Sequence, residues 1–357
     1  MTRTTLLSFF FLAAACLPAR PATIVCVAGC GQGPEDSALG AKFIEPFAVA
    51  FDRRGNLYVC EHKGERIVRI DPSGKAMVLA GTGREGFSGD GGSAAQAAMF
   101  DPHGIVITAG RQMFVADTRN HVIRKIDLKT GRISTVAGTG KAGYSGDGGP
   151  ATKAEFDRTF AIDVDSKGRA LYIADLGNRR IRRVDLKSGI VTTVAGNGEK
   201  GVPQDGADAV GSPLVDPRAV AVAANGSLYV LERGGNALRV VDTQGKILTL
   251  IASTQGELRA ATTVVPDLNG PKHLCVDRSG NVIIADAENS LVRRYDPRTG
   301  KTQALAGTGQ PGQAIVAGEP LKTQLNRPHG VFVHPSGALY ISDSYNNRIL
   351  KLTGWSR

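Results

Sequence analysis

The chain has 357 residues, of which 45 are glycine, 6% are aromatic and 42% are hydrophobic, enough to bury a sizeable core. The formal net charge of +10 is compatible with an anionic partner, although charge alone does not prove one. No run of about 18 apolar residues follows the N-terminal segment, which excludes a later membrane-spanning helix.

Residues 1–22 read as a targeting segment. Arg3 supplies a basic start, and the apolar run 6–17 is too short to span a bilayer. Cleavage is expected near Ala19 or Ala22. The string LAAAC also resembles a bacterial lipobox, which would leave a lipid anchor on Cys16. In both cases the sequence predicts an exported protein that is periplasmic, secreted or lipid-anchored.

Four further cysteines are present: Cys26, Cys30, Cys60 and Cys275. Their spacing matches no zinc pattern. Cys26 and Cys30 lie in an expected strand and would be roughly 13 Å apart, too far for a bridge unless the chain turns between them. We expect buried or half-buried thiols, with a disulfide from Cys30 to a loop as the alternative.

Six similar segments recur with a period of about 56 residues. They are 56–71, 112–127, 170–185, 227–242, 281–296 and 338–353. The acids that follow their first strands are Glu61, Asp117, Asp175, Glu232, Asp286 and Asp343. Each unit carries four strand signals and no helical period, which predicts an all-β fold, a six-bladed β-propeller of four-stranded antiparallel blades.

The two ends of the chain complement each other. The sixth unit stops after its third strand at 351–354, whereas 23–29 has the pattern of a fourth strand. We therefore expect the N-terminal strand to complete the last blade, which removes an open sheet edge. This predicts one propeller domain over 23–357.

The units resemble the NHL repeat. The matching features are the P-x-G-[IV]-x-V entry at 102–107 and 328–333, and the Y-[IV]-[AS]-D-x-x-N core at 172–178 and 340–346. The resemblance covers roughly 23–354 and implies a six-bladed propeller. It leaves the function open, because members bind protein or RNA and a few relatives are lyases or hydrolases.

The D-x-x-N motif is predicted to be structural, because it recurs in most blades. Its side chains would accept backbone N–H groups at the turn between the second and third strands, and its Asn would tolerate positive φ. The residues are Asp117, Asn120, Asp175, Asn178, Asp286, Asn289, Asp343 and Asn346. Basic residues of the next strand are expected to pair with neighbouring blades: Arg69, Lys125, Arg183, Arg239, Arg294 and Lys351.

The stretches 81–92 and 138–149 both end in GDGG and join one blade to the next. We expect Asp90 and Asp147 to cap a short helical turn, followed by a Phe or Leu that plugs the core. A calcium loop is the alternative, but such a site needs six to eight oxygens and each loop offers one carboxylate.

The candidate ligand-binding site is the ring of residues that open the inner strands at one mouth of the channel. These positions differ between blades, so a specific site can be built there. They are Phe47, His103, Phe160, Arg218, Lys272 and His329, with Arg158 and His273 beside them.

The entries DPHG and RPHG also resemble those of peptidyl-α-hydroxyglycine α-amidating lyase, in which such histidines bind zinc. That resemblance implies a metal site at His103 and His329, one ligand short of the usual three because Lys272 takes the third place. The other interpretations are histidines that only line the channel, and an anionic or polar ligand held by Arg218, Lys272 and both histidines.

Three functions follow. The first is an exported binding scaffold whose partner is a protein, a peptide or an anionic glycan of the cell envelope, without a cofactor. The alternative is a metal-assisted enzyme, lyase or lactonase-like, using zinc or calcium. Nucleic-acid binding is disfavoured by the export signal and by basic residues that are spread over all blades.

Overall fold

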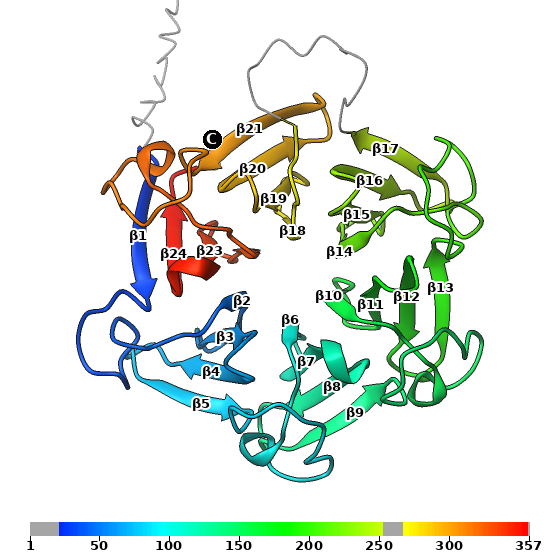
Figure 1. The fold of residues 1–357 in the computed structure, drawn as a ribbon, viewed down its shortest axis with the longest axis horizontal. Helices are drawn as coiled ribbons and strands as arrows, with labels where there is room; N and C mark the ends of the chain where they lie inside the picture. Colours follow the sequence, from blue (N-terminus) through cyan, green and yellow to red (C-terminus); the bar gives the residue numbers. More distant parts are fainter. Residues whose placement is uncertain (1–20, 253–266, 356–357) are drawn as a thin grey trace, which may run out of the picture.

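The computed structural model describes residues 21–252 and 267–355. Six four-stranded antiparallel sheets are arranged in a ring, as Figure 1 shows. The predicted six-bladed propeller is confirmed. The expected signal segment and Cys16 lie outside the described residues, except for residues 21 and 22. Within the two described ranges, no helix is long and apolar enough to cross a membrane.

The blades follow the chain in order, each from its inner to its outer strand. Blade one holds β2 (Pro46–Phe51), β3 (Leu57–Glu61), β4 (Arg66–Ile70) and β5 (Ala76–Ala80). Blade two holds β6 (Pro102–Ile107), β7 (Gln112–Asp117), β8 (Val122–Asp127) and β9 (Ile133–Ala137). Blade three holds β10 (Thr159–Val164), β11 (Ala170–Asp175), β12 (Arg180–Asp185) and β13 (Val191–Ala195).

Blade four holds β14 (Pro217–Val222), β15 (Leu228–Glu232), β16 (Ala237–Val241) and β17 (Ile247–Ile251). Blade five holds β18 (His273–Val276), β19 (Val282–Asp286), β20 (Leu291–Asp296) and β21 (Lys301–Ala306). Blade six holds β22 (Gly330–Val333), β23 (Leu339–Asp343), β24 (Arg348–Thr353) and β1 (Thr23–Ala28). Short 3₁₀ turns lie at Ala94–Gln96, Thr118–Asn120, Ala151–Lys153, Pro320–Lys322 and Ser344–Asn346.

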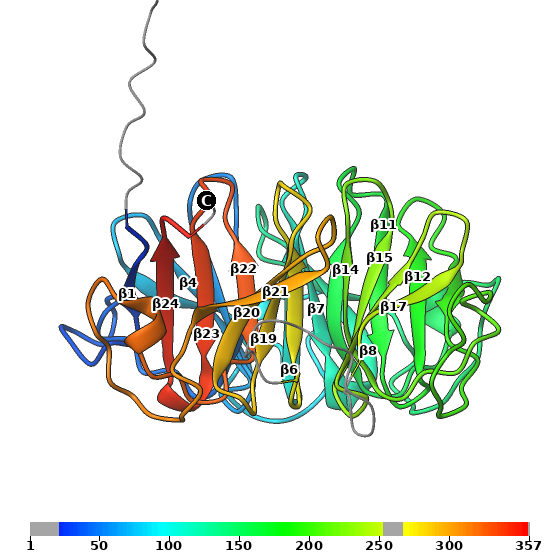
Figure 2. The same cartoon turned by 90° about the horizontal axis from the view of Figure 1, so that it is seen from above.

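The N-terminal strand closes the ring, as the sequence predicts. β1 pairs antiparallel with β24, with Thr23 opposite Thr353 and Ile24 opposite Leu352. Figure 2 shows β1 and β24 side by side. Ile24 is fully buried in the cluster between the last two blades, so the closing strand contributes to the core. Similar clusters lie between the other neighbouring blades, because alternate strand residues face opposite sides of each sheet.

The cysteines correct one expectation. Cys26 and Cys30 form a disulfide, with their Cα atoms 6.0 Å apart. The chain turns between them because β1 ends at Ala28 and Gly29 adopts a φ of 69°. Cys60 is a buried free thiol and Cys275 is a half-buried one.

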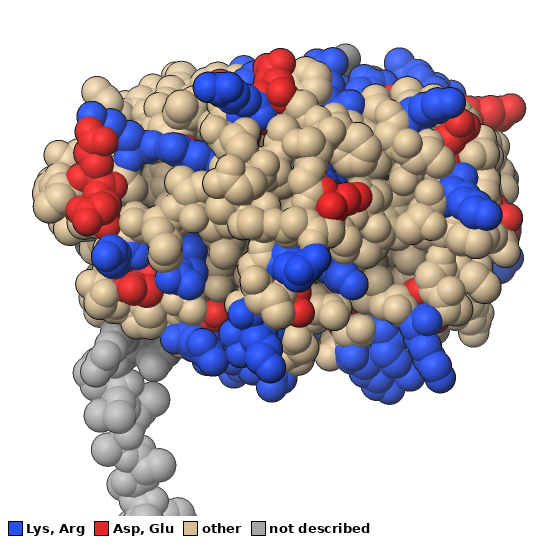
Figure 3. Space-filling model, turned by 90° about the horizontal axis from the view of Figure 1, so that it is seen from below, with Lys and Arg blue, Asp and Glu red and all other residues tan. Residues whose placement is uncertain are grey.

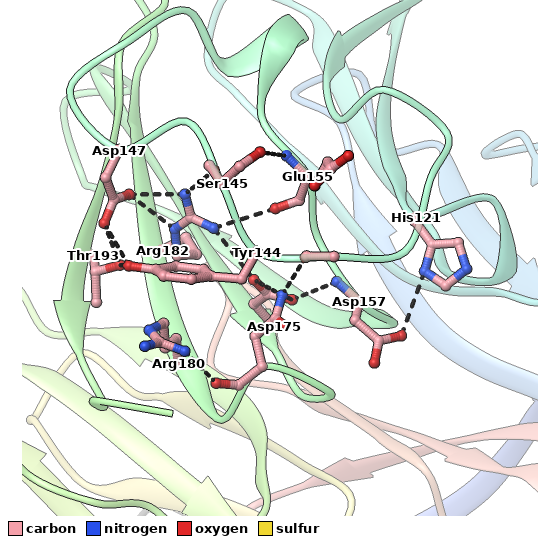
Figure 4. A network of polar contacts seen from close by, with 12 residues as sticks. His121, Tyr144, Ser145, Asp147, Glu155, Asp157, Asp175, Arg180, Arg182 and Thr193 are labelled. Atoms are coloured by element: carbon pink, nitrogen blue, oxygen red, sulfur yellow. Dashed lines mark hydrogen bonds and ion pairs between the residues drawn. The ribbon is translucent and has the colours of Figure 1, made fainter. Parts of the chain in front are cut away.

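In each blade, a network of hydrogen bonds centres on the acid that ends the second strand. Figure 4 shows this network for blade three. Asp175 accepts the backbone N–H of Asp157 at 2.8 Å and the side-chain amide of Asn178. Asn178 also donates to the carbonyl of Gly143, in the connector before the blade. The acid therefore accepts a backbone N–H as predicted, whereas the Asn donates to a backbone carbonyl and, within the described chain, does not accept an N–H. The positive φ, however, belongs to the next residue, as at Arg179, and not to the Asn.

The basic residues that pair with the blade acids are not the predicted ones. Buried Arg182 contacts Asp175 at 3.4 Å and Asp147 of the GDGG loop at 2.7 Å, and Arg124 does the same with Asp117 and Asp90. Both arginines pair within their own blade and the connector before it. Of the predicted set, Arg239 pairs with the blade acid Glu232, and Arg183 pairs with Asp185 at the end of its own strand. The prediction failed because Lys125 and Arg183 lie one residue further on, on the opposite side of the strand.

The GDGG loops are therefore held by ion pairs. Neither Asp90 nor Asp147 caps the 3₁₀ turn that follows it. Phe156 is a buried core plug as expected, whereas in the first loop Met99, not Phe100, is fully buried.

Candidate functional site

The six predicted ring residues line one hollow, which we call the mouth pocket. Each lies at or just before the start of an inner strand: β2, β6, β10, β14, β18 and β22. The pocket lining includes Phe47, His103, Phe160, Arg218, Lys272, His273 and His329. The cavity volume is about 10 Å³, close to the space that one water molecule needs. Only a small chemical group can enter it.

Aromatic and imidazole rings form a continuous belt along one side of the mouth. Phe47 stacks on His329 with 4.0 Å between ring centroids, and on His62 with 4.3 Å. His103 meets the edge of Phe160 at 4.5 Å and lies 4.3 Å from His62. His62 was missed by sequence reasoning. Its signal was its position directly after the acid Glu61, where Thr118 and Ser344 of other blades also contact the neighbouring inner strand.

Arg218 is the unusual group of the pocket. Its side chain is only 5% exposed, and its Nε and Nη1 have no hydrogen-bond partner. The guanidinium lies 3.6 Å from the ring centroid of Phe160 and forms no ion pair within the described chain. The nearby carboxylate of Asp216 is taken by Arg233. Burial, followed by the charge of Arg233, lowers the pKa of Arg218 to about 9.

Lys272 differs from Arg218 because it has a counter-ion. Its Nζ lies 3.2 Å from Glu288, which also binds Arg327. Burial lowers the pKa of Lys272, and the charge of Arg218 adds to this effect. The carboxylate of Glu288 therefore balances two bases, Lys272 and Arg327. The positive charge of Arg218 is left without an acid of its own.

The two ring histidines are neutral and similarly oriented. Nδ1 of His103 lies 2.8 Å from the carbonyl oxygen of Asp101, and Nδ1 of His329 lies 2.8 Å from that of Arg327. Because a carbonyl only accepts, Nδ1 carries the proton and Nε2 is left as an acceptor. Burial, with the charge of Arg218 next, holds both pKa values well below the usual 6.5.

A zinc site does not fit these residues. The ring of Phe47 stands between the two histidines, stacked on His329 and 5.0 Å from His103. The uncompensated charge of Arg218 beside them would oppose a cation. Across the described ranges, no group of three or more His, Cys, Asp or Glu side chains could hold a metal ion.

The ring of six blades and the pocket at one channel mouth place the chain among the six-bladed β-propellers. The family model of the Teneurin NHL domain matches residues 185–352. NHL repeat-containing protein 2 of Gallus gallus is 25% identical over 88% of this chain and 47% of its own length. These matches support an NHL-repeat propeller.

The chain spans about a quarter to a half of the length of the curated relatives that it matches. Among solved structures, an auxiliary nutrient binding protein from Bacteroides thetaiotaomicron aligns with a TM-score of 0.64 and 14% identity, over 93% of this chain and 76% of that one. A streptogramin B lyase aligns with a TM-score of 0.55 and 14% identity, over 93% and 98%. At these identities the likeness concerns the fold.

Proposed function

We propose that this protein is an exported binding module that holds an anionic group of its ligand at the mouth pocket. The observation that carries the proposal is Arg218, a buried guanidinium without a counter-ion and with two unpartnered nitrogens. A buried charge is costly unless it is paired. An incoming carboxylate would pair this charge and accept an N–H bond from the guanidinium.

The shape and polarity of the pocket narrow the ligand further. A cavity of about 10 Å³ admits one oxygen atom of a carboxylate, while the rest of the ligand would lie on the surrounding rim. The neutral histidines present acceptors, so a hydroxyl or N–H next to the carboxylate would complement them. Free peptide C-termini, acidic side chains and uronic acids have this chemistry. The partner classes are thus a protein, a peptide or an anionic glycan of the cell envelope.

The lyase or lactonase-like alternative receives no specific support. It rested on a metal held by His103 and His329, and the geometry around Phe47 does not fit that metal. The shared fold with a lyase does not carry its chemistry over.

Matched probes test the proposal. Short peptides with a free C-terminal carboxylate are compared with their carboxamides, and galacturonate oligomers with their neutral galactose counterparts, by calorimetry. We expect the carboxylate forms to bind, and Arg218→Met to weaken them at least about tenfold. Arg84→Met, on an exposed connector, is the matched control and should leave binding unchanged.

Two results would contradict the proposal. One is equal binding of carboxylates and their neutral counterparts by the unmodified chain. The other is unchanged carboxylate binding in Arg218→Met. Conversion of a probe, followed by chromatography, would instead favour the enzyme alternative.

A further inference from the structure

The face opposite the channel mouth carries an excess of positive charge. It consists of the turns that join the first to the second strand and the third to the fourth strand of each blade; we call it the turn face. Because the strands are antiparallel, both kinds of turn lie at the same end of the blade. They touch in blade three, where Leu186 N–H donates to the carbonyl of Arg169 at 2.8 Å.

Twelve exposed bases lie on the turn face. They are Arg53, Arg54, Lys75, Lys129, Arg132, Lys167, Arg169, Lys187, Lys246, Arg278, Arg298 and Lys301. In the side view of Figure 3, Lys and Arg gather along the lower edge, which corresponds to the upper edge of Figure 2, where β1 begins. Within the described chain, only Arg298 of these twelve forms an ion pair, with Asp296.

The acids of the turn face cancel only part of this charge, because eight aspartates lie among the twelve exposed bases. These aspartates lie at strand ends, and each accepts a backbone N–H of its own turn. Asp127, for example, binds the N–H of Lys129 at 2.7 Å, and Asp165 binds that of Arg169 at 2.6 Å. The others are Asp52, Asp71, Asp185, Asp242, Asp277 and Asp296. The mouth side is different, because Lys63, Arg119 and Arg327 are paired with acids there.

We infer that the turn face docks on a membrane surface that contains anionic phospholipid. The exposed bases are distributed over five blades around a ring, which suits a broad charged plane. The described aromatic side chains with large exposure are Phe87, Tyr144 and Tyr345, on the connectors and at the mouth-side turn of blade six. The turn face therefore lacks the stacking platforms that single-stranded nucleic acid uses.

The place where the chain enters the propeller, at the start of β1, also favours a membrane surface as the partner. Thr23 lies opposite Thr353 at the end of β24, so the chain enters the propeller at the turn face. Blade six, where it enters, is the one whose turns contribute no exposed base in the described chain. In the sequence, Cys16, where the lipobox resemblance places a lipid anchor, lies seven residues before Thr23, a span of at most about 25 Å. An apolar anchor and a basic patch together give stable attachment. Docking by this face would leave the mouth pocket open to its ligand.

Vesicle binding tests the inference. The full chain is sedimented with phosphatidylcholine vesicles, with and without phosphatidylglycerol, at physiological ionic strength. The readout is the ratio of the two partition coefficients, which cancels any attachment through residues 6–17. One variant reverses four turn-face charges, K129E, K167E, K187E and R278E. The matched control reverses four exposed connector charges outside the turns that define the turn face, R84E, K141E, K153E and K200E, so both variants have the same net charge.

We expect the turn-face variant to lower the ratio at least about tenfold, and the control to lower it less than about threefold. An equal loss in both variants would overturn the inference, since net charge would then decide binding. A ratio near one for the unmodified chain would also overturn it, as would tighter binding to a single-stranded oligonucleotide than to the anionic vesicles. Thermal unfolding of both variants verifies that they are folded.

Discussion

At the scale of single residues, Arg218 is expected to lower stability, and we propose that it serves binding. Its charge is buried and unpaired, and only the face of Phe160 offsets the loss of water. Two neighbouring acids are occupied elsewhere, Asp216 by Arg233 and Glu288 by Lys272 and Arg327. A residue that is costly in the free protein and complements an anion is typical of a binding site.

The first prediction concerns stability. Arg218→Met should raise the free energy of unfolding by about 1–2 kcal/mol, because it removes an uncompensated buried charge while losing one cation–π contact. Chemical denaturation measures the change. Arg84→Met serves as the control and should stay within about 0.5 kcal/mol. A clearly destabilised Arg218→Met would mean that the guanidinium has a partner of its own.

The second prediction is the pH dependence of carboxylate binding. The pKa of Arg218 is about 9, and those of His103 and His329 lie well below 6.5. Affinity should therefore be nearly constant between about pH 6 and 8 and should fall above about pH 9, as Arg218 loses its proton. Calorimetry over this range checks it. A transition centred near pH 6.5 would show instead that a mouth histidine titrates with an ordinary pKa.

At the scale of elements, each blade is held by its acid and an arginine, which is buried in every blade except the first, where Arg66 is half-buried. Four arginines lie seven residues after the acid, as Arg182 follows Asp175, and in blades one and six the spacing is five, as for Arg348 and Asp343. The sequence shows the repetition of the acid clearly. The arginine is harder to recognise, because two adjacent bases in the strand differ only in the face they occupy, and its second partner comes from a connector about 35 residues earlier.

The third prediction concerns the GDGG loop. Gly146 has a φ of 88°, and a Cβ there would lie 2.7 Å from the Cα of Ala154, whereas Gly148 has a φ of 81° and open space. Gly148→Ala should cost about 1 kcal/mol of unfolding free energy, from backbone strain alone. Gly146→Ala should cost at least about 2 kcal/mol more, because the 3₁₀ turn must shift. Equal costs in denaturation would show that the loop relaxes freely.

At the scale of the whole molecule, the closing strand joins the two ends of the chain. Ile24 of β1 is buried against the last two blades, whereas its neighbour Val25 points outward and is 47% exposed. The disulfide between Cys26 and Cys30 secures the turn that follows this strand.

The fourth prediction compares substitutions of Ile24 and of its neighbour Val25. Ile24→Ala should lower the free energy of unfolding by about 2–5 kcal/mol, because it leaves a cavity in the core of the closing blade. Val25→Ala should change it by no more than about 0.5 kcal/mol. Denaturant unfolding monitors both variants. Similar values would indicate that β1 does not contribute to the cooperative core.

The sequence by itself determined the number of blades, the order of their strands, the ring closure and the six positions at the channel mouth. These properties follow from a local period that is repeated six times, so each copy supports the others. The tertiary structure decided that Phe47 separates His103 from His329, that His62 joins the belt and that Cys26 reaches Cys30. It also decided that, of the two bases of the mouth pocket, Lys272 has an acid and Arg218 has none in the described chain. The charge balance of a pocket depends on which carboxylates from several blades face it, and no local pattern contains that information.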